Sequence, residues 1–407
     1  MHRPQRTAKR VALAMLAICL LAAAAQAGQA IDEAKTTVWS GQLTLDKEHV
    51  VPAGYALKIE PGTTIRMLKG TYAKITVKGA LIAVGEKDKP IRMLAPNPGC
   101  WGGITFDGDS SGGKLEYCQF LNARRATIMV EGGSPTIRHC TFTFDQYSDG
   151  YIFCRQGARA AIESNTFVWK KYRGRAGVVC ESSPAIIRNN DFGNAQVGVQ
   201  LYGFKPGDPQ ATITGNNSTQ CLAGIFDEET TGSAKWQQAW QSEVITRPDN
   251  LAVSRVGKAD IVTIRTRGKL GASPEVSETY VVSYDGGKFS IKTVLDKNPK
   301  DVSKPKEDVA ISFALADGTK VSIEKFSSGL SLIGADGCMD TKAAYAALIA
   351  DGPAGKQVSW RSPKFQRGHL SYTAADLDGD GVTELLVTTG RWCEGKGQVF
   401  IYRQSEK

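Results

Sequence analysis

Between Leu115 and Ser218, one short phrase of apolar and polar residues returns five times. It consists of an apolar residue, three mostly polar residues, a spacer and usually an aromatic residue. The copies begin at Leu115, Ile137, Ile162, Ile187 and Ile213, with steps of 22, 25, 25 and 26 residues. Repeats of this length bury a face only by stacking on their neighbours. The pattern therefore predicts a solenoid.

The content of the repeats favours strands over helices. Ile, Val, Phe and Thr alternate with polar residues, and Gly, Asn and Ser interrupt them. If successive coils pair as parallel strands about 4.8 Å apart, equivalent residues form ladders along the stack. One predicted ladder lies inside the solenoid and consists of Phe120, Phe142, Phe167 and Phe192. A second lies at a bend between strands and consists of Cys118, Cys140, Asn165, Asn190 and Asn216.

The Ile-x-x-Asn-x-Phe phrases resemble those of right-handed parallel β-helix proteins. This is the fold of the pectate-lyase-like superfamily and of carbohydrate-binding and sugar-hydrolase repeats. The resemblance covers residues 35–230 and implies an all-β chain. Because one fold hosts many activities, function has to be argued from the site.

The first 27 residues are typical of a secretory signal peptide. A basic start precedes an apolar run from Val11 to Ala25, and Ala25-Gln26-Ala27 provides a cleavage site near Ala27. The run is shorter than the roughly 20 residues that cross a bilayer. We expect a periplasmic or extracellular protein that does not span the membrane, whose formal charge falls from +9 to +5 on cleavage.

Two regions are predicted to follow the signal peptide. Residues 28–243 form the β-helix with a C-terminal cap, in which Trp236 and Trp240 lie one helical turn apart. Beyond this the period is lost, and residues 244–407 read as a smaller β-rich, propeller-like domain. A hairpin turned at Asp285-Gly286 is expected within it.

The second region contains an acidic loop that resembles the calcium loops of FG-GAP or VCBS repeats. Carboxylates at positions 1, 3, 5 and 9 with Gly at position 6 suit a hard cation. The predicted calcium ligands are Asp376, Asp378, Asp380, the carbonyl of Val382, and Glu384.

Eight of the nine cysteines remain after cleavage, an even number that fits an oxidising compartment. The candidate disulfides are Cys118–Cys140, Cys154–Cys180 and Cys338–Cys393. Residues one coil apart lie within the range that a disulfide tolerates. Buried free thiols are the alternative, and the spacing leaves both open.

No catalytic signature of the resembled family is present. The phrases Asn-Thr-Asp, Gly-His-Gly and Trp-Ile-Asp-His are all missing. Charged residues that point outward alternate in sign from coil to coil, as cross-strand pairing favours. They are therefore interpreted as structural ladders; their members are Glu116, Arg138, Glu163 and Arg188, and Glu131, Arg155 and Glu181.

Loops on three successive coils are basic and aromatic. Such a surface suits an acidic polysaccharide, because cations meet carboxylates and rings stack on sugar faces. The candidate glycan-binding residues are Arg124, Arg125, Tyr147, Trp169, Lys170, Lys171, Tyr172, Arg173 and Arg175.

The leading hypothesis is a protein that binds an acidic polysaccharide or another cell-envelope component without catalysis. Nucleic acid is not expected as a partner of an exported chain. The second hypothesis is a polysaccharide lyase or hydrolase that uses Lys170, Lys171, Tyr172 or Arg173 near Asp145 and Asp149. The third is a structural or adhesion protein in which an outward apolar stripe docks the second domain or a partner; the stripe consists of Met129, Phe153, Val179 and Phe226.

Overall fold

The computed structural model describes residues 33–404. It omits residues 69–72, 96–100, 124–125, 146–150, 171–173, 230–235, 247, 267–278, 286, 295–310, 316, 329–331, 334–338, 341–342, 353–354, 366–368 and 392–395. The predicted signal peptide lies outside the described residues. Among the residues described, no helix is long and apolar enough to cross a membrane.

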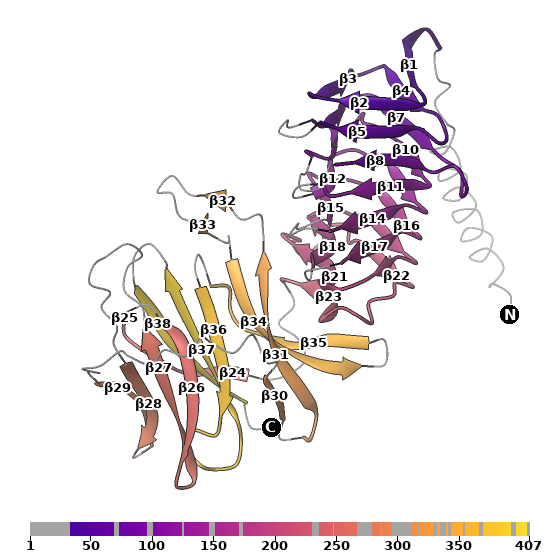
Figure 1. Ribbon diagram of the computed structural model, residues 1–407. Helices are drawn as coiled ribbons and strands as arrows, with labels where there is room; N and C mark the ends of the chain where they lie inside the picture. Colours follow the sequence, from indigo (N-terminus) through magenta and orange to yellow (C-terminus); the bar gives the residue numbers. More distant parts are fainter. Residues whose placement is uncertain are drawn as a thin grey trace, which may run out of the picture.

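The first region is a parallel β-solenoid with three sheets, and the predicted all-β fold is confirmed (Figure 1). A short 3-10 helix, η1 (Glu33–Lys35), precedes it. Sheet A contains β1 (Thr36–Trp39), β4 (Ala56–Ile59), β7 (Ala80–Val84), β10 (Gly112–Glu116), β13 (Thr136–Arg138), β16 (Ala161–Glu163), β19 (Ile186–Arg188) and β22 (Thr212–Thr214). Sheet B contains β2 (Gln42–Leu45), β5 (Thr64–Met67), β8 (Ile91–Leu94), β11 (Cys118–Leu121), β14 (Thr141–Phe144), β17 (Thr166–Trp169) and β20 (Asp191–Phe192). Sheet C contains β3 (His49–Val51), β6 (Ile75–Val77), β9 (Ile104–Asp107), β12 (Ala126–Glu131), β15 (Tyr151–Arg155), β18 (Gly174–Glu181), β21 (Ala195–Tyr202) and β23 (Ala223–Asp227).

The predicted phenylalanine ladder forms the core under sheet B. Phe120, Phe142, Phe167 and Phe192 pair in register and are at most 2% exposed. Their ring centroids are 4.9, 4.7 and 5.2 Å apart along the stack. The repeat therefore places one ring per coil at the same depth, as predicted.

The second region consists of antiparallel sheets. One contains β24 (Trp236–Gln241), β38 (Lys396–Gln404), β37 (Glu384–Arg391) and β36 (His369–Ala375), with β25 (Ile245–Thr246) paired to β38. Another contains β26 (Pro248–Val256), β27 (Ala259–Thr266), β28 (Thr279–Asp285) and β29 (Lys288–Val294). The remaining strands are β30 (Ile311–Ala314), β31 (Lys320–Ser328), β34 (Ala343–Gly352) and β35 (Gly355–Arg361) in one sheet, and β32 (Leu332–Ile333) with β33 (Met339–Asp340). The predicted hairpin is confirmed, since Asp285 pairs with Lys288 across β28 and β29.

The predicted helical cap is wrong. Trp236 and Trp240 lie on strand β24, which pairs antiparallel with β38. The register shifts between Gln238 and Trp240, and the two tryptophans pack in different apolar clusters. The ring of Trp236 is buried and lies 5.8 Å from that of Trp360. Residues 236–241 therefore pack within the second region.

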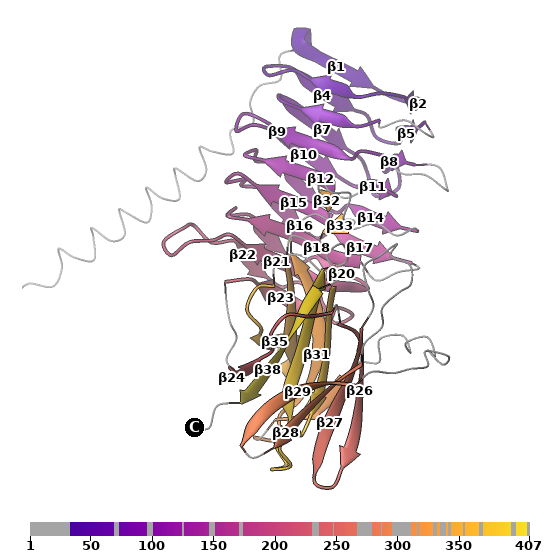
Figure 2. The same ribbon diagram turned by 90° about the vertical axis from the view of Figure 1, so that its left-hand side faces the viewer.

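The second region packs against the C-terminal coils of the solenoid (Figures 1 and 2). The predicted apolar stripe makes this contact: Phe153, Val179 and Phe226 belong to one buried cluster with Phe326 and Tyr345, and Met129 packs at its edge. The third hypothesis was right that this stripe docks the second region. The same contact means that the stripe is not a free binding surface.

A buried carboxylate lies beside this apolar contact. Glu228, which follows β23, accepts bonds from the Nε2 of Gln200 at 2.9 Å and from the hydroxyl of Tyr345 at 2.7 Å. The ammonium of Lys364 lies 3.8 Å from it. Burial raises the pKa of Glu228, although these bonds and the charges of Lys364 and Arg175 oppose the rise. The junction is therefore polar as well as apolar.

Candidate functional site

The chain passes from sheet A to sheet B through a short bend whose first residue has a left-handed backbone. Tyr117, His139, Ser164 and Asn189 occupy this position on four successive coils, with φ from 49° to 57°. A side chain here points away from the core. The next residue points inward and holds the bend, because it belongs to the predicted ladder of Cys118, Cys140, Asn165, Asn190 and Asn216.

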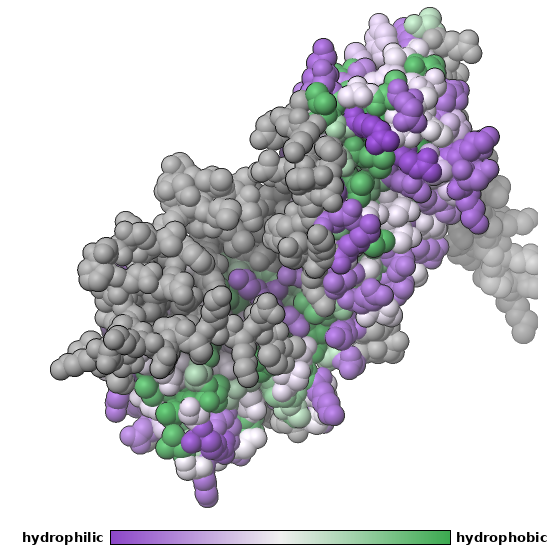
Figure 3. All heavy atoms as spheres, in the orientation of Figure 1, coloured by the Kyte–Doolittle hydropathy of each residue, from purple (hydrophilic) through white to green (hydrophobic). Residues whose placement is uncertain are grey.

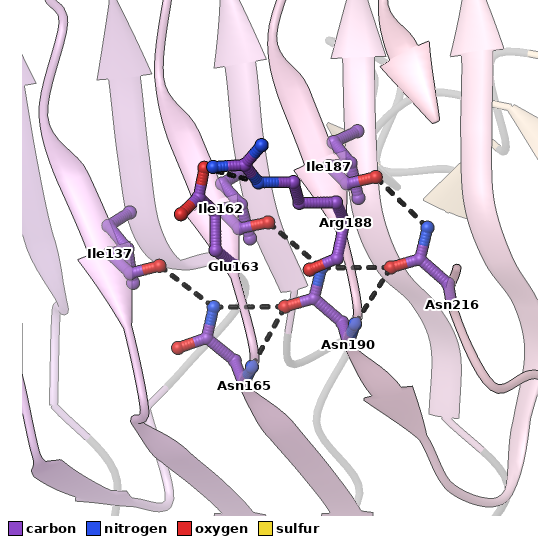
Figure 4. Close-up of polar contacts among 8 residues, drawn as sticks. All are labelled: Ile137, Ile162, Glu163, Asn165, Ile187, Arg188, Asn190 and Asn216. Carbon is purple, nitrogen blue, oxygen red and sulfur yellow. Dashed lines mark hydrogen bonds and ion pairs between the residues drawn. The ribbon is translucent and has the colours of Figure 1, made fainter. Parts of the chain in front are cut away.

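Asparagine side chains bond the bends of neighbouring coils together (Figure 4). The Nδ2 of Asn165 donates to the carbonyl of Ile137 at 2.9 Å and to the Oδ1 of Asn190 at 3.0 Å. The Oδ1 of Asn165 accepts the backbone N–H of Cys140 at 3.0 Å. Asn190 makes the equivalent bonds to Ile162 and Asn216. This confirms the predicted ladder and fixes the bend that carries the outward residues.

Cys118, Cys140, Cys154 and Cys180 are buried thiols that form no disulfide. Cys118 and Cys140 donate to the carbonyls of Ala83 and Leu115, at 3.3 and 3.4 Å. Cys154 pairs in register with Cys180. The predicted neighbours are therefore adjacent, but they are not bonded to each other as disulfides. Cys338 and Cys393 lie outside the described residues.

Two of the left-handed positions carry aromatic rings. The rings of Tyr117 and His139 stack with centroids 5.1 Å apart and planes 15° apart. Tyr117 is half-buried and His139 is exposed. The following coils carry the small or amide side chains of Ser164 and Asn189 at this position.

A loop of the preceding coil forms a wall beside the ring pair. Between β7 and β8 the bend is lengthened to residues 85–90, where Glu86 and Lys89 exchange backbone bonds at 3.2 and 3.1 Å. The amide of Gly62 donates to the carbonyl of Lys89 at 2.9 Å and supports the loop from the coil before. The wall and the bends enclose a groove of about 290 Å³, here called the bend groove. Its lining includes Lys87, Tyr117, Gln119, His139, Ser164 and Thr166.

The bend groove opens onto the outer face of sheet B. A polar row crosses five consecutive strands in register; it consists of Arg92, Gln119, Thr141, Thr166 and Asp191. Beside it runs a half-buried row of Leu94, Leu121, Thr143 and Val168. The described residues of the second region do not cover this face, which is turned toward the viewer in Figure 1 and carries both polar and apolar side chains in Figure 3.

Three residues of the predicted basic patch, Trp169, Lys170 and Arg175, are among the described residues, and Lys170 directly follows β17 of sheet B. Lys170 is exposed and its ammonium lies 2.9 Å from Asp145. Arg175 is half-buried on β18. Arg124, Arg125, Tyr147, Lys171, Tyr172 and Arg173 lie outside the described residues, as does Asp149.

Trp169 does not lie on the surface as the patch required. It is 5% exposed, pairs in register with Phe144, and stacks on that ring at 5.2 Å. Trp169 follows Phe167 by two residues, so strand alternation turns both rings into the core. It therefore cannot serve as an exposed sugar platform.

Charged residues of the predicted ladders form ion pairs between neighbouring coils, and Glu181 accepts a bond from the hydroxyl of Tyr202. Arg138 pairs with Glu116 and Arg188 with Glu163, each at 2.8 Å. Arg155 bonds Glu131 on sheet C. The carboxylates of these ion pairs therefore each have a cationic partner one coil away.

The acidic loop of the second region brings three of its predicted ligands together. Carboxylate oxygens of Asp376, Asp378 and Glu384 lie within 4.8 Å of one another. Asp380 is bonded instead to the backbone amide of Val382, at 2.7 Å. Arg403 bonds Asp378 and Glu384, and Arg255 lies 3.3 Å from Asp376.

The carboxylates of this loop are incompletely neutralised by the two arginines. Burial raises the pKa of Glu384 to about 7, and the nearby Asp378 charge adds to the rise despite Arg403. Burial also raises the pKa of Asp378. Hard cations favour carboxylate oxygens, so the donor set fits a divalent ion.

Comparison with protein families supports the fold of the first region. Residues 99–234 match the family model described as a right handed beta helix region. The solenoid is a right-handed parallel β-helix. In general terms, this match fits a protein that binds or processes glycans. A search of curated proteins gives no match. The matched segment contains Tyr117 and His139, and it ends before the FG-GAP-like loop, whose resemblance stays a prediction.

The residues of the bend groove were not among the candidate site residues predicted from the sequence. A signal for them was present, because the third residue of the repeated phrase is aromatic in the first two copies, as Tyr117 and His139, and Ser in the next. The wall was not recognisable from the period, since residues 85–90 precede the five clear copies.

Proposed function

We propose that this is an exported protein that binds a glycan along the outer face of sheet B. The observation that carries the proposal is the in-register polar row from Arg92 to Asp191, which borders the bend groove and is left uncovered by the described residues of the second region. Sugars combine hydroxyl groups with apolar ring faces. A polar row next to the half-buried row of Leu121 and Val168 offers a partner to each.

The rigid scaffold favours binding. Strand side chains stand on a backbone that is held by parallel pairing and by the asparagine ladder. Groups that are ordered before binding lose less entropy when the ligand arrives. Gln119 is already positioned in this way, because its Oε1 accepts a bond from the Nε of Arg92 at 3.2 Å.

The experiment is a glycan array followed by titration calorimetry with the strongest ligand. Gln119→Ala combined with Thr166→Ala removes two hydrogen-bonding groups and should weaken binding by about 2 kcal/mol, at roughly 1 kcal/mol per bond. Thr136→Ala combined with Thr212→Ala, on the outer face of sheet A, is the matched control and should bind normally. Equal affinities of the two double variants would reject the proposed face.

The enzyme hypothesis is tested in the same samples. Assays for new reducing ends and unsaturated products report hydrolysis and lyase cleavage. Lys170 and Asp145, the pair considered for that chemistry, lie 2.9 Å apart at the margin of the face. Product formation that stops in Lys170→Ala would favour an enzyme over a binding protein.

We also propose calcium as a ligand of the second region. Asp376, Asp378 and Glu384 would hold it, and the observation in favour is that their oxygens converge while the pKa values of two of them are raised. Calcium would balance the negative charge of the carboxylates that Arg403 and Arg255 do not neutralise. Its expected role is to stabilise the region, because a ligand that binds only the folded state favours that state.

A further inference from the structure

We propose that the bend groove is a subsite for an anionic sugar unit of the glycan, whose ring stacks on His139 and whose acidic substituent pairs with Lys87. This inference rests on the proposed function and adds the site and the ligand class. The proposed ligand is a pyranose ring that carries an acidic substituent, either a carboxylate or a sulfate group.

Backbone strain first points to the ring pair. A left-handed backbone is unusual for residues other than Gly, Asn, Asp and His, and it is strained for a bulky side chain such as that of Tyr117. The chain uses Asn189 and Gly215 at this position on later coils, yet it places Tyr117 and His139 in the groove. Asn or Gly fits the same bend with less strain than Tyr117, so the ring that supports His139 is present at a cost to folding.

The stack of aromatic rings ends at His139, and the groove continues beyond it. Tyr117 and His139 lie on neighbouring coils with nearly parallel planes. The next coil continues the series with Ser164, a small side chain that lines the groove. One face of His139 is covered by Tyr117, and its other face looks toward Ser164. A sugar ring placed over Ser164 would continue the stack.

The charge of the groove selects the ligand. Lys87 carries a positive charge in the lining of the groove. Among the described residues no carboxylate lies within ion-pair distance of Lys87, while the neighbouring Glu86 pairs with Lys89 at 3.8 Å. Arg138 at the same bend is matched by Glu116. The unmatched ammonium therefore favours an acidic sugar over a neutral one.

Hydroxyl groups complete the recognition. Thr141 and Thr166 line the floor of the groove with Gln119, and the three belong to the polar row of sheet B. A sugar held by His139 and Lys87 thus lies at the edge of the face on which the rest of the glycan extends. Binding of one sugar unit in the subsite would fix the position of the whole glycan on sheet B.

The test uses the full-length protein and three matched oligosaccharides: one carboxylated, one sulfated and one neutral. His139→Asn removes the ring and keeps a residue that tolerates the left-handed bend. It should weaken binding of the acidic ligands by about three- to tenfold. Lys87→Gln should weaken binding of the acidic ligands by about two- to fivefold and leave the neutral ligand unchanged. Lys114→Gln, an exposed lysine on sheet A, is the matched control.

A self-blocking variant gives an independent readout. Ser164→Tyr should place a third ring in the stack and abolish binding at the subsite, with a small fall in melting temperature because residue 164 has the same left-handed backbone as Tyr117. Wild-type affinity in both His139→Asn and Ser164→Tyr would overturn the subsite. Equal affinity of the wild type for acidic and neutral ligands would overturn the assignment of an anionic sugar. If these results occur while Arg92→Ala, which changes the polar row outside the groove lining, still weakens binding, the proposed face stands and only the subsite fails.

Discussion

The ring of Phe226 lies nearly parallel to that of Phe326, with centroids 4.5 Å apart and planes 17° apart. Phe226 belongs to the last strand of sheet C, and Phe326 belongs to β31 of the second region. Both side chains are at most 1% exposed. This pair joins the two regions, so the outward apolar stripe of the solenoid is an internal interface and the free faces lie elsewhere.

Phe326→Ala should destabilise the chain by about 3 to 5 kcal/mol, because it removes a buried ring and leaves a cavity at the junction. Urea unfolding followed by tryptophan fluorescence measures this loss. We expect the two regions to unfold in separate transitions in the variant, since the shared contact is weakened. A loss below about 1 kcal/mol with a single transition would show that the regions are held together by other contacts.

Phe142→Ala should cost a similar amount, about 3 to 5 kcal/mol, for a different reason. Phe142 is stacked on both sides, by Phe120 and Phe167, so its cavity affects three coils. Tyr55→Ala is a control in the same region, because Tyr55 is 48% exposed. The prediction fails if thermal denaturation shows equal stability of the two variants.

The free energy of unfolding should depend on pH through the protonation of Glu228. Its folded-state pKa is raised by burial among Gln200, Tyr345, Lys364 and Arg175. Its contribution to stability is therefore fully present below the unfolded pKa, near 4.5, and is lost as pH rises through the higher folded value.

Glu228→Gln cannot titrate, so its unfolding free energy should increase relative to wild type as pH rises from 4.5. The comparison needs unfolding curves of both proteins in a series of buffers. A difference that does not change with pH would remove Glu228 as the titrating group.

Calcium should raise the melting temperature of the second region and leave the solenoid transition in place. Asp378→Ala removes one of the converging carboxylates and should abolish the effect. Asp351→Ala, an exposed acid on β34, is the control and should respond like wild type. Identical melting curves of the wild type with calcium and with chelator would contradict the calcium proposal.

The solenoid was predictable because each repeat carries the same information. A constant step aligns Phe120 with Phe142 and Asn165 with Asn190, and no contact distant in sequence is needed to place them. Trp169 was misplaced although the same rule applies to it, since it follows Phe144 by one period of 25 residues. It was predicted to lie on the surface because it stands next to basic residues, although its spacing from Phe144 indicated a position in the core.

The remaining features depend on contacts that no local pattern specifies. Trp236 lies on a strand because β38, more than a hundred residues later, supplies its partner. The bend groove needs Lys87, His139 and Ser164 from three coils and a lengthened loop in one of them. The register makes Cys118 and Cys140 neighbours, but register alone does not create a disulfide between them.

The central claim is that a glycan lies along the outer face of sheet B. Its most direct test is a crystal structure of the protein with the oligosaccharide that the array selects. The account predicts sugar density over β8, β11, β14 and β17, in contact with Gln119 and Thr166, with one ring against His139. Density confined to sheet A or to the second region would contradict it.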